Sequence, residues 1–315
     1  MVYLISSAMS ERVQGCHTRM CDHRMAVKLT QRAPAKLNLS LAIVGREADG
    51  FHRLVSCIVP LALADTLGFS PGGVADTMDC DDTSIPIDGS NLVLRAAAVF
   101  RAAHPAAPHG HFALSKSVPH GAGLGGGSSD AACALRLLNT AAGRPFDNDR
   151  LRELATTVGS DCAFFVDPVP AVMRQRGELL QGLPDSQAVA FHGRHVLLIK
   201  PVWGISTARA YGWLVADGGY AQESDAELAL AAALPNPEAV VKLGNSLQAP
   251  VFARHPELAK GLAALKSTLG ISAVMTGSGS ACFALVDGPV DLVRVRAALE
   301  PAWGPGVWAT VTNLA

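Results

Sequence analysis

The densest chemical signal in the chain is a glycine-rich loop at residues 119–132, PHGAGLGGGSSDAA. Its five glycines fall within seven positions and are followed by two serines and an alanine-rich run typical of a helix. Glycine lets a backbone adopt positive φ and approach a ligand closely, and the first turn of a helix offers unpaired N–H groups at a positive dipole end. The loop therefore predicts a binding site for a polyphosphate.

Other nucleotide loops fit this segment less well. A Walker A loop requires a lysine directly after its glycines, and none follows Gly127. Residues 121–126 do match the dinucleotide fingerprint G-x-G-x-x-G, with Asp147 and Asp149 about 20 residues further on. Those acidic residues, however, open a predicted helix instead of ending a strand. A glycine turn without a ligand is the remaining alternative, but it leaves the entropic cost of the glycines unexplained.

A second set of reactive side chains lies outside the loop. Asp161 follows Gly159 and Ser160 and precedes the apolar run CAFF, while Lys36 and Asn38 occupy the polar face of an alternating segment. An aspartate at such a position could be a general base or simply a cap for a turn or helix. A lysine on an alternating strand could equally be a solvated surface residue. The residues alone leave both alternatives open.

Composition limits the classes of protein and partner. The chain has 315 residues, 49% hydrophobic and 17% charged, with a formal net charge of −1 at pH 7, so we expect a globular protein with small-molecule partners and no attraction to nucleic acid or anionic lipid. No apolar run is long enough to span a bilayer. Seven scattered cysteines are typical of reduced thiols, which predicts a cytoplasmic location. Cys16, His17, Cys21 and His23 could bind zinc but lack a second ligand pair at finger spacing. The oligomeric state is not indicated.

Periodicity predicts the elements that must position these residues. In the first half of the chain we expect two antiparallel strands at 33–44 and 54–67, then turns with a weak hairpin at 71–90 and a helix capped by Asn91 at 91–102. A strand at 111–118 leads into the glycine loop, the loop helix spans 125–142, and a further helix begins at about 146. Strand and helix patterns mix without steady alternation. The predicted class is α+β, with mixed or antiparallel sheets and a cleft between two lobes.

The second half continues this mixture. We expect strand-like segments at 162–166, 196–199, 273–275 and 281–286, a hairpin at 173–180, and helices at 226–234 and 258–269. Residues 182–185 have the composition of a linker. Residues 1–30 show little periodicity, and we expect them to be an irregular extension.

Three separated motifs resemble those of a known family. They are the loop at 119–132, the segment APAKLNLSLAIVGREADGFH at 33–52, and MTGSGSACFAL at 275–285. Together they resemble the signature motifs of the small-molecule kinases that act on galactose, homoserine, mevalonate and phosphomevalonate. The first segment and the triple glycine are most similar to members whose acceptor carries a cytidine diphosphate group. The resemblance runs from about residue 33 to the C-terminus, in the family's order.

The resemblance implies roles for the reactive residues. Asp161 would be the general base on the acceptor hydroxyl, and Lys36 would hold the ionised Asp161 and steady the acceptor oxygen. ATP would be the donor, with Mg²⁺ as cofactor, although the metal ligands are left undetermined. The residues expected at the nucleotide are Lys116, Pro119, Gly121, Ala122, Gly123, Leu124, Gly125, Gly126, Gly127, Ser128 and Ser129.

The resemblance also implies an acceptor site, formed by Asn38, Phe51, His52, Tyr211, Gly277 and Gly279. His52 would read the cytosine, Phe51 would line its pocket where relatives often carry tyrosine, and Tyr211 would stack. Without the resemblance, His52 would be taken as a surface residue and the late glycines as a plain turn. The sequence Asn245-Ser246-Leu247 stands where relatives often have Asn-Asp-Leu, which leaves the role of Asn245 open.

The implied reaction is ATP-dependent phosphorylation of a hydroxyl on a cytidine diphosphate derivative, in the non-mevalonate route to isoprenoid precursors. The implied organisation is an ATP-binding domain at 31–190 and a substrate-binding domain at 191–315. Three alternatives are a sister kinase for a homoserine or mevalonate type of alcohol, a catalytically silent nucleotide-binding protein, and a nicotinamide-dependent oxidoreductase.

Overall fold

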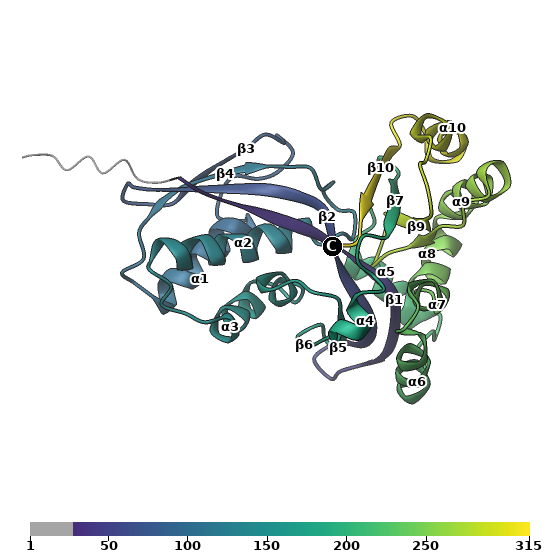
Figure 1. Ribbon diagram of the computed structural model, residues 1–315, viewed down its shortest axis with the longest axis horizontal. Helices are drawn as coiled ribbons and strands as arrows, with labels where there is room; N and C mark the ends of the chain where they lie inside the picture. The colour runs from purple at the N-terminus through teal and green to yellow at the C-terminus, as the bar shows by residue number, and fades with distance from the viewer. Residues whose placement is uncertain (1–27) are drawn as a thin grey trace, which may run out of the picture.

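The computed structural model describes residues 28–315. The expected irregular extension at 1–30 falls almost entirely outside this range, and so do the possible zinc ligands Cys16, His17, Cys21 and His23. The described chain forms two lobes, with the early part of the sequence in one and the late part in the other (Figure 1). Two long strands extend from the first lobe toward the second.

These two strands are β1 (Leu29–Arg46) and β2 (His52–Pro71), which pair antiparallel as expected. The register shifts at three places, between Pro34 and Lys36, Asn38 and Ser40, and Ile43 and Gly45. Such shifts bend a strand and increase its twist, which allows β1 and β2 to curve between the lobes. The polar face of β1 is covered there, so Lys36, Asn38 and Ser40 are buried, unlike the polar face of a solvated strand.

The first lobe contains a sheet in the order β3-β4-β2-β5-β6, with β1 paired to β2. Its remaining strands are β3 (Thr77–Cys80), β4 (Gly110–Ser115), β5 (Ala171–Gln175) and β6 (Leu179–Gly182). One face is covered by α1 (Leu92–Ala103), α2 (Gly126–Ala141), α3 (Asn148–Val158) and the short 3-10 helix η1 (Cys162–Val166) (Figure 1). The helix that follows the glycine loop therefore lies inside the lobe.

Two local predictions for this lobe are wrong. The expected hairpin at 71–90 is absent, because β3 instead pairs parallel with β4. The segment at 162–166, expected to be strand-like, is η1. All five of its residues are buried, and a continuous apolar run carries no alternation that could distinguish a strand from a tight helix.

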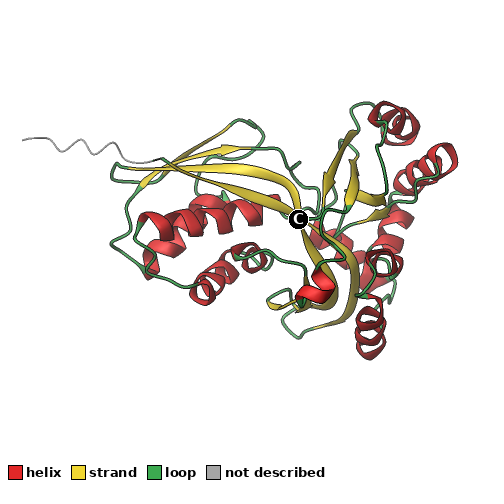
Figure 2. Cartoon of the chain, in the orientation of Figure 1, coloured by secondary structure: helices red, strands yellow, loops and turns green. Residues whose placement is uncertain are grey.

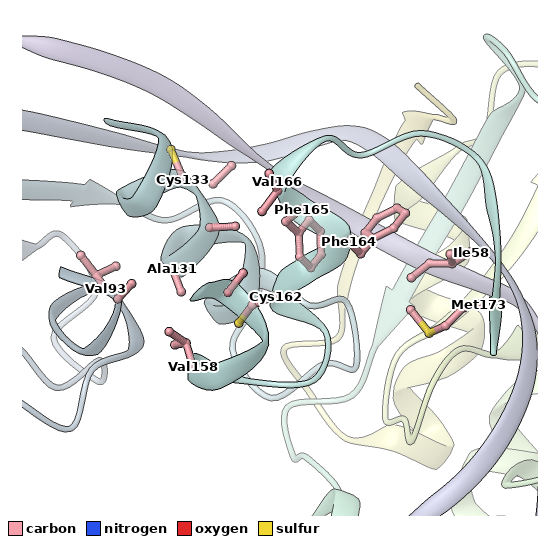
Figure 3. Close-up of a cluster of buried hydrophobic side chains, with 14 of the residues drawn as sticks. Ile58, Val93, Ala131, Cys133, Val158, Cys162, Phe164, Phe165, Val166 and Met173 are labelled. Carbon is pink, nitrogen blue, oxygen red and sulfur yellow. The ribbon is translucent and has the colours of Figure 1, made fainter. Parts of the chain in front are cut away.

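A hydrophobic core fixes η1 against the loop helix (Figure 3). The buried side chains come from the helices and from the sheet beneath them: Val93, Ala131, Cys133, Val158, Cys162, Phe164, Phe165, Ile58 and Met173. Because η1 begins directly after Asp161, this packing determines where that carboxyl stands relative to the start of α2.

The second lobe is built on a four-stranded sheet in the order β10-β7-β9-β8. Its strands are β7 (His195–Lys200), β8 (Val274–Met275), β9 (Cys282–Val286) and β10 (Trp308–Asn313). The helices of this part are α4 (Asp185–Ala188), α5 (Thr207–Ala216), α6 (Glu223–Ala233), α7 (Pro237–Lys242), α8 (Gln248–Arg254), α9 (Pro256–Leu269) and α10 (Leu292–Trp303). Figure 2 shows helices and strands mixed in both lobes, and the predicted α+β class with antiparallel and mixed sheets is confirmed.

Two backbone bridges tie the lobes together: Leu41 of β1 with Asn245, and Leu61 of β2 with Leu314. Cys57, Cys80, Cys133, Cys162 and Cys282 are free thiols. Over residues 28–315, none of the helices combines the length and the hydrophobicity needed to cross a bilayer.

Candidate active site

A cavity of about 1090 Å³ gathers residues from both lobes. Most of the predicted site residues line it: Lys36, Asn38, Phe51, His52, Lys116, Pro119, Gly121, Ala122, Gly123, Leu124, Gly125, Gly126, Gly127, Ser128, Asp161, Tyr211 and Gly277. Two others do not. Ser129 is fully buried behind the loop, and Gly279 packs against the back of Gly123. Residues more than two hundred positions apart in sequence thus face one space.

The glycine loop has the backbone conformation expected of an anion cradle. Gly121, Gly123 and Gly125 have positive φ values of 64°, 78° and 73°, and α2 begins immediately afterwards. Gly125 is the N-cap residue, and no side chain caps the helix. The N–H groups of the first turn therefore remain available to a ligand in the cavity, at the positive end of a helix of 16 residues.

Close packing explains why glycine is needed at two of these positions. A Cβ atom on Gly125 would stand 2.6 Å from a ring carbon of Phe165 and 3.0 Å from Cγ of Lys36. A Cβ atom on Gly123 would stand 3.1 Å from the carbonyl oxygen of Thr276 in the late motif, residues 275–285. The loop is therefore wedged between β1 and η1 on one side and the late motif on the other.

Behind the loop lies a buried charge cluster that the sequence reasoning missed. Lys116 Nζ donates to Asp65 Oδ2 and, at 2.8 Å, to Asp130 Oδ2. Asp65 also accepts the backbone N–H groups of Ser117 and Val118, at 2.6 and 2.8 Å. Burial, helped by the nearby Asp65 and opposed by Lys116, raises the pKa of Asp130 to about 7. Lys116 also lines the cavity, and its ammonium group supports the loop through these two pairs; its expected contact with the nucleotide stays a prediction.

The proposed catalytic pair is assembled. Lys36 Nζ lies 3.8 Å from Asp161 Oδ2, and the Asp161 side chain is 37% exposed while that of Lys36 is buried. Asp161 occupies the N-cap position of η1, but its side chain makes no capping hydrogen bond. The simple capping alternative therefore fails, and the carboxyl is free to meet a substrate. Burial lowers the pKa of Lys36, and the charge of Asp161 opposes that shift.

Asn38 holds Lys36 in place. Its Oδ1 accepts a hydrogen bond from Lys36 Nζ, and its Nδ2 donates to Ser56 Oγ at 2.8 Å. Ser56 Oγ donates in turn to the carbonyl oxygen of Ser40 at 2.6 Å. The Asn38 N–H donates to Thr276 Oγ1 at 3.0 Å, which ties this part of β1 to the late motif.

Aromatic rings form another wall of the cavity. The rings of His52 and Tyr211, which both line it, have centroids 4.7 Å apart; Tyr220 packs near His52, 6.2 Å away, without lining the cavity. His52 Nε2 is buried without a hydrogen-bond partner among the described residues. Burial and the nearby charge of Arg46 lower the pKa of His52, so its ring is neutral near pH 7. An unpaired nitrogen beside aromatic faces suits the edge of a planar base.

Phe51 stands at the open side of this wall and is 56% exposed. The guanidinium of Arg176 lies over its ring, 4.9 Å from the centroid, and pairs with Asp49 at 2.7 Å. Arg176 lines the cavity from the tip of the β5–β6 hairpin. The sequence reasoning missed Arg176, because it lies in no motif and only the folded β5–β6 hairpin brings it to the site.

Apolar side chains and one amide from β4 and the region around the start of α1 also line the cavity: Ile85, Pro86, Asn91, Leu92 and Leu114. Asn91 also caps α1, accepting from the Val93 N–H at 2.9 Å. The sequence predicted that cap but not its place at the cavity. Within residues 28–315, no cluster of three or more His, Cys, Asp or Glu side chains could hold a metal ion.

These features, an anion cradle at a helix start facing a lysine and carboxylate pair, define a phosphotransferase type of site. Comparison with known families agrees. Residues 91–173 match the model of the GHMP kinases N terminal domain, and residues 227–306 match that of the GHMP kinases C terminal. The chain belongs to the GHMP kinase family, and the predicted ATP-dependent small-molecule kinase class is confirmed.

Individual relatives show which members of the family this chain is similar to. The chain is 38% identical over 284 residues to 4-diphosphocytidyl-2-C-methyl-D-erythritol kinase of Xanthobacter autotrophicus, covering 86% of this chain and 95% of that protein. It is 36% identical to the protein of the same name from Deinococcus radiodurans, covering 90% and 92%.

Solved structures extend the comparison. A crystal structure of 4-(cytidine 5'-diphospho)-2C-methyl-D-erythritol kinase has a TM-score of 0.70 and 32% identity, covering 90% of this chain and 99% of that one. A homoserine kinase from Cytophaga hutchinsonii, at 17% identity, covers 91% of this chain and 95% of its own, with a TM-score of 0.67. At that identity the likeness concerns the fold alone.

Proposed function

We propose that this protein transfers the γ-phosphoryl group of ATP to the 2-hydroxyl of 4-diphosphocytidyl-2-C-methyl-D-erythritol, a step toward isoprenoid precursors outside the mevalonate route. The observation that carries the proposal is the position of the Lys36–Asp161 pair, which faces the same cavity as the glycine loop and the His52–Tyr211 wall. Membership of the kinase family supports ATP as the phosphoryl donor. The relatives at 36–38% identity support 4-diphosphocytidyl-2-C-methyl-D-erythritol as the acceptor.

The nucleotide enters from the side of the glycine loop. Backbone N–H groups of residues 121–128 and the start of α2 bind the phosphates, and the part of the cavity lined by Ile85, Pro86 and Leu92 takes the adenine. Mg²⁺ neutralises phosphate charge when it is bound. Because the described residues offer no cluster of metal-binding side chains, we propose that the phosphates supply most of its ligands.

Phosphoryl transfer then needs alignment and one proton acceptor. The acceptor oxygen approaches Asp161, which takes its proton as the new O–P bond forms and the bond to the leaving ADP breaks. Lys36 lies within 3.8 Å of that carboxyl, and its positive charge favours the ionised base and the developing charge on the acceptor oxygen. Asn38 keeps the lysine directed at this point.

The cytidine end lies against the aromatic wall. Tyr211 and Phe51 offer ring faces for stacking, and the unpaired His52 Nε2 offers a hydrogen bond to the base edge. We also propose a cytoplasmic location, supported by the free thiols. The division into a nucleotide-binding domain at 31–190 and a substrate domain at 191–315 stays a prediction. Some residues of the proposed acceptor site lie on β1 and β2, which belong to the first of these two ranges.

The test is ADP release from Mg²⁺-ATP with this acceptor, run beside homoserine and mevalonate and repeated with Asp161→Asn. We expect turnover with the cytidine compound alone and its loss in the variant. Turnover only with another alcohol would replace the acceptor and keep the kinase class. Nucleotide binding with no turnover of any alcohol would favour a silent nucleotide-binding protein.

A further inference from the structure

Asn245 occupies a junction between the two lobes. It lies between α7 and α8, where the chain forms a parallel bridge with Leu41 of β1. The Leu41 N–H donates to the Gly244 carbonyl at 3.0 Å, and the Ser246 N–H donates to the Leu41 carbonyl at 2.8 Å. These bonds on both sides of Asn245 fix its backbone to the strand that carries Lys36.

The side chain of Asn245 uses all its main hydrogen-bonding groups. Nδ2 donates to the carbonyl oxygens of Met275 and Gly277, at 2.9 and 2.8 Å, and Oδ1 accepts the Leu247 N–H at 2.9 Å. Because the carbonyls only accept and the N–H only donates, the amide has one possible orientation. One side chain thus holds two carbonyls of the late motif.

The two peptide units whose carbonyls Asn245 holds differ in their N–H groups. In the Met275–Thr276 peptide, the Thr276 N–H donates to the Ala281 carbonyl at 3.1 Å. In the Gly277–Ser278 peptide, the Ser278 N–H has no acceptor among the described residues. The C=O and N–H of a trans peptide point in opposite directions, so a Gly277 carbonyl bound to Asn245 directs the Ser278 N–H the other way. Gly277 and Ser278 both line the cavity.

The position of this turn relates it to the reaction. Gly277 has φ of 54°, and a Cβ atom there would stand 3.1 Å from the Gly123 carbonyl and 3.5 Å from Lys36 Nζ. The Ser278 hydroxyl pairs with Thr207 Oγ1 at 2.9 Å, which fixes the side chain on the α5 side. The free N–H therefore belongs to a rigid turn between the phosphate loop and Lys36.

We propose that Asn245 is a positioning residue for phosphoryl transfer: its amide holds the Gly277 carbonyl so that the Ser278 N–H faces the cavity and donates to the phosphoryl group in transit. This inference rests on the proposed kinase function. A backbone donor aimed where negative charge develops stabilises that charge without reorganisation. The role would also connect β1 to the late motif through a single side chain.

The experiment compares Asn245→Ala with Gln248→Ala. Gln248 is a matched control, because its Oε1 accepts the Met275 N–H at 2.9 Å and so supports the same short strand without touching Gly277. Three quantities are measured for each: kcat, the Kd of a non-hydrolysable ATP analogue with Mg²⁺, and hydrogen exchange of the Ser278 amide with and without that analogue. Asn245→Asp, which keeps the bond to Leu247 but cannot donate to two carbonyls, replaces the alanine variant if that one fails to fold.

For Asn245→Ala we expect kcat to fall by about ten- to a hundredfold, as for a small misplacement of a catalytic donor, with Kd changed by less than about threefold. The analogue should slow exchange at Ser278 in the wild type and in Gln248→Ala, but not in Asn245→Ala. Equal protection in all three proteins, or equal losses of kcat in both variants, would overturn the proposal. If the wild type fails to phosphorylate the acceptor while exchange at Ser278 still depends on Asn245, the proposed substrate is wrong and the role of Asn245 stands.

Discussion

The donor side and the acceptor side of the cavity are built in different ways. The phosphate-binding part of the donor side is one continuous segment, residues 119–128, that binds through its backbone and the start of α2. The acceptor side collects side chains from β1, β2, η1 and α5, with Lys36 and Asp161 separated by 125 positions yet 3.8 Å apart. A backbone site depends on local conformation, whereas a side-chain site depends on the packing of the whole lobe.

This difference predicts how each side fails. Substitutions on the acceptor side should alter single steps, because each side chain has its own task. Substitutions on the donor side should change the backbone conformation of the glycine loop. The size of each effect should depend on the φ angle of the glycine and on the free space around it. Variants on the two sides can test whether the separation is real.

The largest effect is expected for Asp161→Asn. Loss of the base should lower kcat by about a hundredfold or more, while the affinity for the ATP analogue stays unchanged, because the loop does not depend on this carboxyl. Steady-state kinetics and calorimetric titration of the analogue check the two halves of this prediction. A parallel loss of nucleotide affinity would mean that the two sides are not separable.

The next effect is expected within the loop itself. Gly125→Ala forces a Cβ atom to within 2.6 Å of Phe165 at a φ of 73°, whereas the Cβ of Gly121→Ala meets nothing within 4 Å, although φ is 64°. Both variants carry the strain of positive φ, about 1–2 kcal/mol, but only the first must also displace Phe165 and Lys36. We expect kcat/KM for ATP to fall at least about tenfold more in Gly125→Ala. Equal losses would show that φ, and not packing, determines the loop.

A third effect concerns the charge of Lys36. Burial lowers its pKa, so the ammonium should lose its proton at a pH below the ordinary value for lysine, and kcat should fall as the pH rises through that range. Asp161→Asn removes the opposing charge and should move the loss to still lower pH in whatever activity remains. Lys36→Arg, which keeps its charge, should abolish this decline of kcat. A pH–kcat profile unaltered by Lys36→Arg would assign the decline to another group.

The two sides also differ in how much the sequence could predict. The glycine loop, its helix and the helix cap at Asn91 depend on local residue types, and the structure places them as expected. The run at 162–166 was misassigned because a segment buried on every side has no period. Family resemblance supplied the pairing of Lys36 with Asp161; nothing in the spacing of two residues so far apart indicates contact.

Residues that belong to no motif could not be predicted. Asp65 reaches Lys116 only because β2 runs beside β4, and Arg176 reaches Phe51 only because the β5–β6 hairpin folds toward the β1–β2 turn. The burial of Lys36 was hidden for a similar reason. Its strand alternates like a solvated one, but the glycine loop packs against Lys36 and the segment at Thr276 against Asn38, so the polar face is covered.

The fourth prediction addresses the aromatic wall. His52→Gln should raise KM for the acceptor by about tenfold through loss of one hydrogen bond to the base, with KM for ATP unchanged. Because the pKa of His52 is lowered, protonation should affect the wild-type acceptor KM only below about pH 6.5, the ordinary value for histidine. Acceptor titrations from pH 5.5 to 8 measure this. A change in KM for ATP instead would place the nucleotide at this wall.

The smallest effect concerns the buried cluster behind the loop, where the donor side does depend on side chains. Burial raises the pKa of Asp130 to about 7, and its Oδ1 is buried without a hydrogen-bond partner among residues 28–315. Above about pH 7 its carboxyl is ionised, which adds a negative charge behind the bound polyphosphate; below it that charge is neutralised. KM for ATP should therefore rise a few-fold between pH 6 and 8, an effect of about 1 kcal/mol at a charge separation screened by protein and water. Asp130→Asn should flatten this rise.

The control for that measurement is His120→Asn, because His120 also lines the cavity and is exposed. If the rise in KM persists in Asp130→Asn but disappears in His120→Asn, the histidine is responsible and the buried cluster only supports the loop. If the rise in KM disappears in Asp130→Asn alone, nucleotide binding is accompanied by protonation of the Asp130 carboxyl behind the glycine loop. The backbone cradle would then depend on one buried side chain for its response to pH, in the way that the acceptor side depends on several.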